Sequence, residues 1–373
     1  MVDADPAPGT GTPRTRLVHV GLGGWGRDWE RNALPPVGEV ERVAVVDAHE
    51  PSLRSAQEEL GLPDAACFTS LAEALAAVPA DGVLVTAPVR SHVPVALEVL
   101  DAGLHVLVEK PFAPSVAEAR TAVERAEQRG LVLQVSQNYR AYPAPRAVRE
   151  LIAAGAVGDL SVVHVDFRRW GNDAPPGGNP HHAFPHPLLF DMAIHHFDLL
   201  RMVTGREAVR VHATVTDPPW SRFEQEASAV LTIEMSGGLV AGYRGSWVSR
   251  APQTAWDGEW SIEGEHGRIA FTGRGEDGPA DDVVTLSREG GAPERVDLPV
   301  LPLWGRSAGL QQFHRAVRGG PAPEVTGRSN LPSLAVCEAA VRSVASGRTE
   351  DVEQFEVSER FEQPHRGGGA GQP

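Results

Sequence analysis

The chain has 373 residues, of which 42% are hydrophobic and 22% are charged. A chain of this length favours two domains, each with its own apolar core, and the composition is that of a globular protein rather than a disordered or fibrous one. The formal net charge is -15 at pH 7, and no lysine- or arginine-rich run offers a surface for a phosphate backbone. We therefore expect no nucleic-acid partner.

The ends of the chain and its cysteines bear on where the protein works. Residues 1–14 and 363–373 are rich in glycine, proline and polar residues, so we predict that both segments are disordered. The first segment lacks the apolar core of a signal peptide, and no run approaches the roughly 18 apolar residues of a membrane span. We expect a cytoplasmic protein with no membrane partner. Cys67 and Cys337 form no CxxC pattern and are expected to be free thiols.

Residues 15–137 alternate short apolar runs with helix-like stretches. The runs that predict buried strands are 16–20, 41–46, 81–86, 104–109 and 131–135. The predicted helices are 51–60, 70–77, 92–102 and 115–129. Several of these helices have serine or proline at the start and glycine after the end, which are ordinary boundary signals. The alternation predicts a parallel sheet with helices on both faces.

After about residue 138 the pattern changes to strands that follow one another directly. A helix at 144–154, a strand at 161–168, a loop at 171–187 and a helix at 188–204 come first. Strands are then predicted at 209–215, 226–234, 239–248, 258–263 and 267–272, and closing helices at 304–318 and 331–346. Because turn signals separate these strands, we predict that 138–362 form an α+β domain with an open, mostly antiparallel sheet.

A glycine loop follows the first predicted strand and has the G-x-G-x-x-G spacing. Gly21 permits a tight turn, Gly23 lets the backbone approach a pyrophosphate, and Gly26 allows close packing of helix against strand. The following helix would begin around Gly24 and Trp25, where its amides and dipole favour phosphate groups. Because the spacing lies between a predicted strand and a predicted helix, we assign 15–137 to a Rossmann dinucleotide-binding domain.

Asp47 ends the second predicted strand, 21 residues after Gly26. A carboxylate at this place binds the ribose hydroxyls of NAD and repels the 2'-phosphate of NADP. We therefore predict NAD as the cofactor in preference to NADP, although Arg27 is a cation that could alter the preference. The alternative is that the glycines only punctuate a loop and that Asp47 is a solvated strand end.

Three further motifs occur in a fixed order along the chain. The fourth predicted strand of the first domain ends at Glu109-Lys110-Pro111, the preceding strand ends at Thr86-Ala87-Pro88, and the helix at 188–204 carries an Asp-x-x-x-His pattern. With the glycine loop, these motifs resemble the glucose-fructose oxidoreductase / inositol dehydrogenase (Gfo/Idh/MocA) family over roughly residues 15–350. The resemblance implies a Rossmann domain, and a second domain whose open sheet forms the interface of a homodimer or homotetramer. It also implies an active site between the two domains.

The resemblance implies roles for single residues. Lys110 is expected to touch the substrate hydroxyl and the nicotinamide region. Glu109 is expected either to hold the backbone in position or to contact the cofactor. Further cofactor contacts are implied for Thr86, Pro88, His92 and Asn138. Without the resemblance, Glu109-Lys110-Pro111 is ordinary surface charge before a proline at a helix start.

The helix at 188–204 places Asp191, His195 and Asp198 at i, i+4 and i+7, which predicts one polar stripe. A histidine with a pKa near neutrality suits removal of a hydroxyl proton, so His195 is the preferred general base. Lys110 would stabilise the developing alkoxide, and Asp191 would orient either partner. The alternative for His195 is a hydrogen-bonded core histidine. His196 is expected to be structural or to face another subunit. The family usually has glycine where this chain has Ala193.

The loop before this helix contains or adjoins other candidates. Arg168, Arg169 and Trp170 end the strand that precedes it and are expected to contact a polyol substrate. Five histidines lie between residues 181 and 196. They show no HExxH spacing and the resembling family generally needs no metal, so we predict no metal site.

Together these features predict an NAD-dependent dehydrogenase that moves hydride at a hydroxyl carbon of a sugar, a sugar derivative or a cyclitol. One alternative is an NAD-dependent glycosidase or lyase that oxidises its sugar transiently to activate cleavage. A second alternative is a non-catalytic regulator that binds NAD as a ligand.

Overall fold

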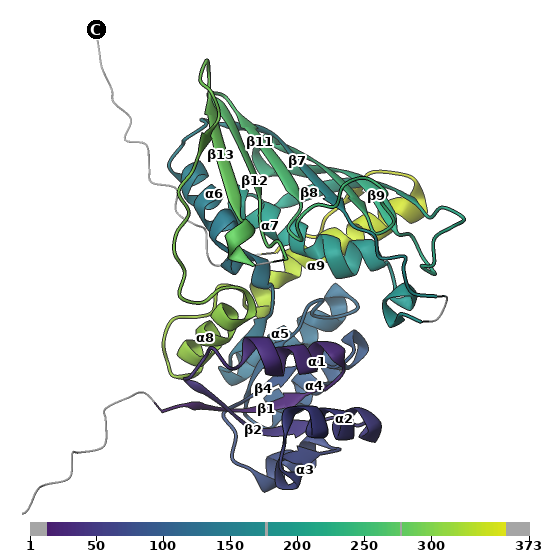
Figure 1. The fold of residues 1–373 in the computed structure, drawn as a ribbon, viewed down its shortest axis with the longest axis vertical. Helices are drawn as coiled ribbons and strands as arrows, with labels where there is room; N and C mark the ends of the chain where they lie inside the picture. Colours follow the sequence, from purple (N-terminus) through teal and green to yellow (C-terminus); the bar gives the residue numbers. More distant parts are fainter. Residues whose placement is uncertain (1–12, 176–177, 277, 356–373) are drawn as a thin grey trace, which may run out of the picture. The chain divides into compact units, whose positions relative to one another are not determined.

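A computed structural model describes residues 13–175, 178–276 and 278–355 (Figure 1). The tail predicted at 363–373 and residues 1–12 of the predicted lead-in lie outside the described residues. The chain divides into two compact units. The first unit consists of Met1–Glu109, Thr121–Ser136 and Arg306–Thr326, and the second of Lys110–Arg120, Gln137–Gly305 and Gly327–Pro373.

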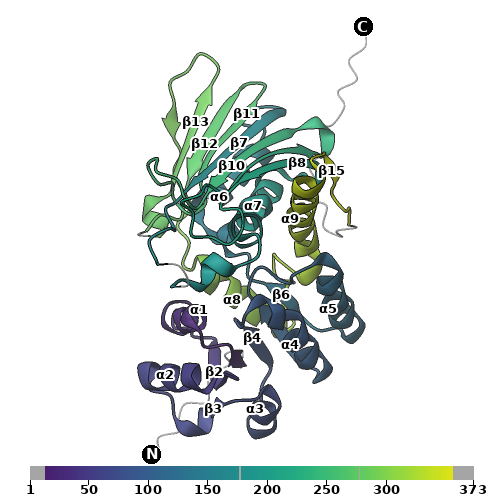
Figure 2. The same cartoon turned by 90° about the vertical axis from the view of Figure 1, so that its right-hand side faces the viewer.

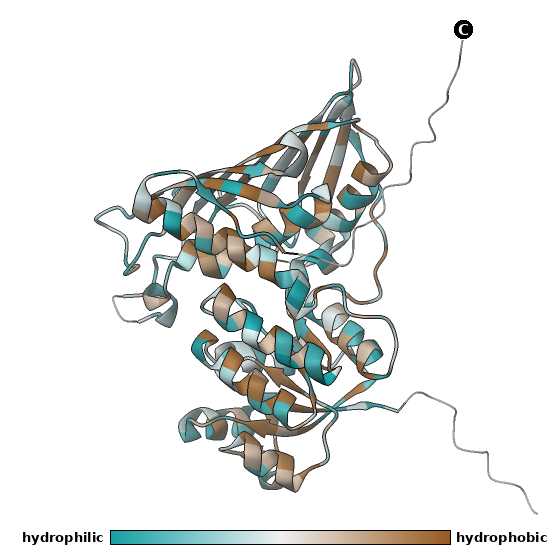
Figure 3. Ribbon diagram, turned by 180° about the vertical axis from the view of Figure 1, so that it is seen from behind, coloured by the Kyte–Doolittle hydropathy of each residue, from teal (hydrophilic) through white to brown (hydrophobic). Residues whose placement is uncertain are grey.

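The first unit is built on a six-stranded sheet with the order β3-β2-β1-β4-β5-β6. All pairings in it are parallel, as the alternation of strands and helices predicts. The strands are β1 (Thr15–Val20), β2 (Val40–Val46), β3 (Cys67–Phe68), β4 (Gly82–Val85), β5 (His105–Val108) and β6 (Leu133–Val135). Most of their valine and leucine side chains are buried, and Figure 3 shows the sheet as hydrophobic. Both the strand order and the apolar runs are those of a Rossmann domain.

Six helices belong mainly to this unit. They are α1 (Gly24–Asp28), α2 (Glu50–Leu60), α3 (Leu71–Ala77), α4 (Val89–Asp101), α5 (Val116–Arg129) and α8 (Gly305–Val317). The sequence analysis placed α8 in the second domain because it follows that domain's sheet along the chain. In the structure α8 packs on the first unit, where Thr15 Oγ1 hydrogen-bonds His314 Nδ1 at 2.8 Å and Ser307 Oγ donates to Ala33 O at 2.9 Å.

The second unit is built on a nine-stranded sheet with the order β14-β13-β12-β11-β7-β10-β9-β8-β15. Only β7 and β10 pair in parallel, so the prediction of a mostly antiparallel sheet is confirmed. The strands are β7 (Leu160–Arg168), β8 (Ala208–Thr216), β9 (Ser228–Met235), β10 (Val240–Ser246), β11 (Glu259–Gly264), β12 (Gly267–Thr272), β13 (Val283–Arg288), β14 (Glu294–Arg295) and β15 (Glu350–Asp351).

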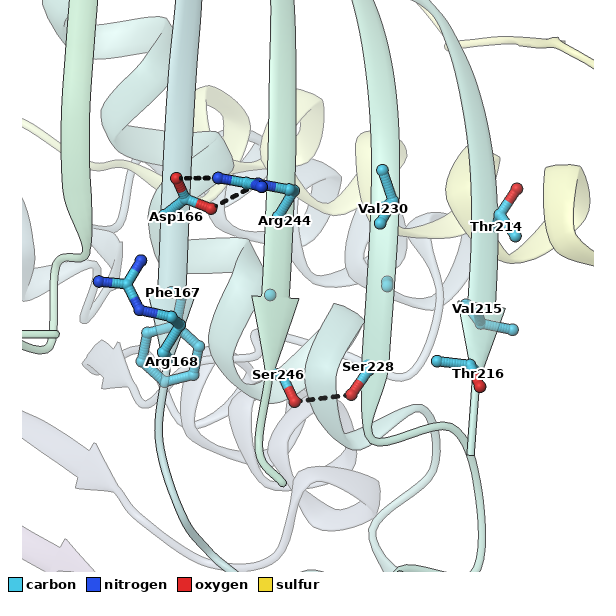
Figure 4. Close-up of a pocket in the computed structure, with 12 residues that line it drawn as sticks. Asp166, Phe167, Arg168, Thr214, Val215, Thr216, Ser228, Val230, Arg244 and Ser246 are labelled. Atoms are coloured by element: carbon cyan, nitrogen blue, oxygen red, sulfur yellow. Dashed lines mark hydrogen bonds and ion pairs between the residues drawn. The ribbon is translucent and has the colours of Figure 1, made fainter. Parts of the chain in front are cut away.

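Three helices pack against one face of this sheet: α6 (Pro143–Ala153), α7 (Ile194–Thr204) and α9 (Gly327–Ser346) (Figure 2). The alternation along β7 follows from this arrangement. Val163, Val165 and Phe167 are buried beneath the helices, whereas Asp166 and Arg168 project from the opposite face. Figure 4 shows this opposite face, which we call the open face, with Asp166 bonded to Arg244.

Candidate active site

The glycine loop is packed tightly on one side. Gly21 has φ +98°, and a Cβ atom added there would lie 2.4 Å from Ala87 N. A Cβ atom on Gly26 would lie 1.9 Å from Gly21 O, so neither position accepts a side chain. At Gly23 and Gly24 an added Cβ meets nothing within 4 Å. The loop therefore presents open backbone at the two positions where a phosphate group would approach. Trp25 beside them is 42% exposed and packs against the Arg306 guanidinium.

The side chains behind the loop hold it in place. Thr86 Oγ1 donates to Gly21 O at 2.6 Å and is 2.8 Å from His19 Nε2. His19 Nδ1 in turn lies 2.7 Å from Glu30 Oε1. The sequence analysis expected Thr86 to line the cofactor. In the structure its hydroxyl instead supports the turn that the loop requires.

Asp47 lies at the end of β2 with its carboxylate fixed by backbone. Leu22 N donates to Oδ2 at 2.7 Å, and His49 N donates to Oδ1 at 2.9 Å. The carboxylate is therefore tied to the glycine loop itself and is held beside it. A negative charge in this position favours ribose hydroxyls and repels a 2'-phosphate.

The other residues predicted to bind the cofactor contact neighbouring groups of their own unit or begin a helix or turn there. Glu109 is 1% exposed and accepts from Trp29 Nε1 at 2.8 Å. His92 is 2% exposed, with Nε2 2.7 Å from Ala87 O, and Pro88 is the N-cap of α4. Asn138 is buried and begins a 3-10 turn in the second unit.

A polar cluster in the second unit joins Lys110, Asp191 and His181. Lys110 Nζ donates to Asp191 Oδ1 at 2.6 Å and to Asp191 O at 2.9 Å. His181 Nε2 lies 2.8 Å from the other carboxylate oxygen, Oδ2. Burial alone would raise the pKa of Asp191, but the Lys110 ammonium and the hydrogen bond and charge of His181 outweigh it and hold the pKa well below its usual range. Asp191 is thus a permanent carboxylate that fixes the lysine.

His195 lies in the same unit and is 3% exposed. Its imidazole stacks on the Tyr139 ring, with centroids 3.8 Å apart and planes 7° from parallel. Burial lowers the pKa of His195 well below its usual range, and the positive charges of Lys110 and Arg274 lower it further. The sequence analysis expected a pKa near neutrality. The structure instead gives an imidazole that is neutral at pH 7, whose Nδ1 has no hydrogen-bond partner among the described residues.

The predicted stripe on one regular helix is wrong. The segment Pro187–Ala193 is a π-helix, and α7 begins only at Ile194. Asp198 points into the protein, where it accepts from Arg140 Nε at 2.6 Å and from Ser333 Oγ at 2.9 Å. The wider π turn changes the angular relation between residues on either side of it. Asp191 is therefore available to Lys110, while Asp198 belongs to a buried ion pair.

His196 has a structural environment. It is 1% exposed, its Nδ1 is 3.2 Å from Tyr243 Oη, and its Nε2 is 3.1 Å from Trp256 O. Burial lowers its pKa to about 4. Through these two contacts His196 joins α7 to β10 and to the loop between β10 and β11.

We expect this buried histidine to make the protein acid-sensitive. The unfolded chain binds a proton at His196 near pH 6.5, whereas the folded chain does so only near pH 4. Stability is therefore full above pH 6.5 and is lost as the pH falls toward 4, by about 3 kcal/mol at this residue. His195 acts with the same sign. The thermal midpoint should fall from pH 7.5 to pH 4.5 more steeply in the native protein than in His196→Gln. Equal slopes would contradict this account.

Arg168 and Trp170 are not brought to the Lys110 cluster. Arg168 projects from the open face, where its Nη2 donates to Glu259 Oε2 at 2.7 Å (Figure 4). Trp170 Nε1 donates to Asp173 Oδ1 at 2.5 Å, and the Arg250 guanidinium lies 3.5 Å from the Trp170 ring centre. Even-numbered residues of β7 face away from the helices, so Arg168 lies on the open face, and its contact with a substrate stays a prediction.

Two family models match this chain. An "Oxidoreductase family, NAD-binding Rossmann fold" model matches residues 15–137, and a "GFO/IDH/MocA C-terminal domain" model matches residues 146–270. The chain belongs to the Gfo/Idh/MocA oxidoreductase family. Its first unit is accordingly an NAD-binding Rossmann domain, and the open backbone at Gly23 and Gly24 with the carboxylate of Asp47 fits that cofactor.

Relatives within the Gfo/Idh/MocA family are named as dehydrogenases and reductases. The scyllo-inositol 2-dehydrogenase (NAD(+)) of Bacillus subtilis is 26% identical, over 90% of this chain and 95% of its own length. The 1,5-anhydro-D-fructose reductase of Ensifer adhaerens is 24% identical, over 88% and 95%. An oxidoreductase from Agrobacterium radiobacter, solved with NAD+, L-tartaric acid and magnesium, has 21% identity and a TM-score of 0.77 over 91% of this chain and 98% of its own.

The family motifs account for Lys110 and Asp191, but the sequence analysis missed His181. The sequence predicts only that the loop of this histidine contacts substrate or is exposed, and that it holds no metal. Among the residues that the structure describes, no group of three or more His, Cys, Asp or Glu side chains is arranged to hold a metal ion. The sequence feature that could have indicated His181 is its position in the loop directly before the helical segment that carries Asp191.

We expect His181→Phe to impair turnover without loss of the fold. Phenylalanine preserves the aromatic contact to Trp247, whose ring centre is 5.0 Å away, but removes the hydrogen bond to Asp191. A hydrogen bond to a charged group contributes about 1.5–3 kcal/mol, so kcat/KM should fall roughly 10- to 100-fold while the affinity for NAD is unchanged. His266→Phe, at a side chain that is 62% exposed, is the matched control. Equal kinetics for the two variants would show that His181 does not position Asp191.

Proposed function

We propose that this enzyme oxidises a secondary hydroxyl of a sugar, sugar derivative or cyclitol, with NAD as the hydride acceptor, and catalyses the reverse reduction. The observation that carries the proposal is the Lys110–Asp191 ion pair in the same unit as a buried, neutral His195. An ammonium fixed by a carboxylate and an uncharged imidazole are the groups that alcohol oxidation requires.

The proposed reaction converts a secondary alcohol and NAD+ into a ketone, NADH and a proton. Bound NAD supplies the acceptor for the hydride that leaves the carbinol carbon. The hydroxyl proton passes to the imidazole of His195, which is free to accept it because it is neutral at pH 7. The Lys110 ammonium donates a hydrogen bond to the oxygen and stabilises its negative charge. Asp191 and His181 keep the lysine directed at that oxygen.

The cofactor is proposed to bind along the glycine loop of the first unit. The backbone at Gly23, Gly24 and Trp25 would approach the pyrophosphate, and the carboxylate of Asp47 would accept hydrogen bonds from a ribose. Direct contacts from Thr86, Pro88, His92, Glu109, Lys110 and Asn138 are part of the same proposal. The neighbouring charge of Asp47 is the reason for preferring NAD to NADP.

Incubation with NAD and a panel of neutral and acidic sugars and cyclitols tests the function. We expect NADH to form in proportion to ketone product. Release of an aglycone without net NADH would instead identify a glycosidase or lyase that oxidises its sugar transiently. Tight NAD binding with no turnover of any panel member would favour a regulatory protein.

We further propose that the open face of the second unit's sheet joins copies of the chain into a homodimer or homotetramer. This face bears Val230, which is 56% exposed, between the Asp166–Arg244 ion pair and Thr214 (Figure 4). An apolar centre with a polar surround is the composition of a protein interface. Light scattering should give a mass of two or four chains, and Val230→Glu should lower it. A native mass of one chain would contradict the proposal.

A further inference from the structure

Arg274 has an unusual backbone conformation. It follows β12 and has φ +53°, and only one other non-glycine residue in the described part of the chain, His186, has a positive φ. Two hydrogen bonds fix the conformation, from Arg274 N to Asp282 Oδ1 at 2.8 Å and from Trp256 N to Arg274 O at 3.1 Å. A left-handed residue with a long side chain is strained, and such strain is concentrated at binding and catalytic sites.

The guanidinium of Arg274 and the imidazole of His195 both contact the ring of Tyr139. Its Nη1 donates to Tyr139 Oη, and its Cζ is 4.3 Å from the centre of the Tyr139 ring, which stacks on His195. Among residues 13–175, 178–276 and 278–355, no carboxylate oxygen lies within ion-pair distance of the Arg274 guanidinium, whose side-chain partners are the phenol groups of Tyr139 and Tyr142. The charge of Asp257 acts on Arg274 without forming an ion pair, and burial raises the pKa of that carboxyl well above its usual range.

A second guanidinium, that of Arg169, lies near the same Trp256 ring as Arg274. Its Cζ is 4.0 Å from the centre of the Trp256 ring, and the Cζ of Arg274 is 5.7 Å from that centre. Arg169 is 9% exposed, and its Nε has no hydrogen-bond partner among the described residues. Its carboxylate partner, Glu276, has a side chain that is 72% exposed, so this ion pair is easily exchanged for a ligand.

We propose that Arg274, with Arg169 beside it, binds an anionic group of the substrate, so that the enzyme acts on an acidic sugar or cyclitol derivative bearing a carboxylate or a phosphate. This inference rests on the proposed function. A largely buried cation without a counter-ion is unfavourable, and a ligand anion removes the cost. The planar fork of a guanidinium fits two oxygens of either group, and the aromatic rings of Tyr139 and Trp256 offer a surface for a sugar ring.

The test compares neutral sugars and cyclitols with related acids and phosphate esters. Initial rates with NAD are measured for glucose, glucuronate, gluconate and glucose 6-phosphate, and for inositol and inositol phosphate. We expect at least one acidic member to have a kcat/KM 10-fold or more above its neutral counterpart. A preference for the uronate or aldonate identifies a carboxylate as the group, and a preference for the phosphate esters identifies phosphate. Equal or better turnover of the neutral sugars would overturn the inference but leave the proposed function intact.

Two variants locate the effect at Arg274. Asparagine tolerates the left-handed conformation, so Arg274→Asn should retain the native thermal midpoint while KM for the acidic substrate rises 10-fold or more and the ratio of acidic to neutral kcat/KM falls by a similar factor. Arg274→Lys should restore part of the preference. Arg288→Asn, on β13 and paired with Glu294 at the surface, is the control and should leave both substrates unaffected. Arg274→Asn with a lower midpoint and an unchanged ratio of acidic to neutral turnover would mean that Arg274 is only structural.

If no sugar in the panel is oxidised, isothermal titration still tests the inference. The native protein, saturated with NAD, is titrated with glucuronate and with glucose 6-phosphate. Binding of either that Arg274→Asn weakens 10-fold or more would support the anion site even though the dehydrogenase proposal had failed. Absence of binding by both anions would overturn it.

Discussion

Lys110→Met should reduce kcat for NADH formation by about 10²- to 10³-fold, the usual cost of removing one donor that stabilises a developing oxyanion. Methionine keeps most of the volume of the lysine stem but has no proton to donate. The lysine Nζ is held 2.6 Å from Asp191 Oδ1, so its loss removes both the donor and the partner of that carboxylate. Steady-state kinetics with the best substrate of the panel would measure the effect.

The control for this variant is the binding of NAD, which should weaken far less than kcat falls, because the glycine loop and Asp47, proposed to bind the pyrophosphate and a ribose, belong to the other unit. Lys110→Arg retains the charge but not the compact geometry, and we expect it to recover only part of kcat. Native turnover in Lys110→Met, with the protein folded and saturated with NAD, would remove Lys110 from the mechanism.

Asp198→Ala should destabilise the second unit by about 3–5 kcal/mol, because it leaves the Arg140 guanidinium buried without its carboxylate. The side chains of Arg140 and Asp198 are 8% and 2% exposed. Two guanidinium nitrogens and the Ser333 hydroxyl donate to the carboxylate, at distances of 2.6–2.9 Å. The variant should therefore show a markedly lower thermal midpoint, measured by circular dichroism at pH 7.

Asp191→Ala is the matched comparison, seven residues earlier on the same segment. Its carboxylate is 24% exposed, so water can replace part of the lost interaction and the midpoint should fall less. Its kcat, by contrast, should fall as that of Lys110→Met does. A larger stability loss in Asp191→Ala than in Asp198→Ala would contradict the assignment of one carboxylate to chemistry and the other to the core.

Much of the fold is predictable because its strands are long enough to show a pattern. The strands of the first sheet except β3 carry apolar runs that alternate with helices, which is the strongest signal that a single sequence offers. The strands that the analysis missed are β3, β13, β14 and β15. Three of them are two residues long and lie at sheet edges, where their pairing depends on a neighbour rather than on their own side chains.

The residues of the candidate site could be predicted only where they belong to a recognisable sequence motif. Glu109-Lys110-Pro111 and the Asp-x-x-x-His pattern indicated Lys110 and Asp191. Arg168 and Arg169 are adjacent in the sequence and were expected to act together, but adjacent residues of an extended chain point to opposite sides, so the two arginines have different surroundings. Arg274 gave no signal, because its role depends on a backbone angle and on contacts between segments far apart in the chain. For His181 the sequence indicated only a loop that could contact substrate, because its hydrogen bond to Asp191 forms in the folded chain.

Transfer of an isotopic label tests the central claim most directly. The best substrate of the panel is prepared with deuterium at the carbinol carbon and incubated with NAD and the native enzyme, and the NADH is analysed by mass spectrometry. The account predicts that the deuterium appears in the reduced nicotinamide, one per ketone formed, and that Lys110→Met slows this transfer by about 10²-fold or more. Ketone or cleavage product formed while the reduced cofactor carries no deuterium would contradict it.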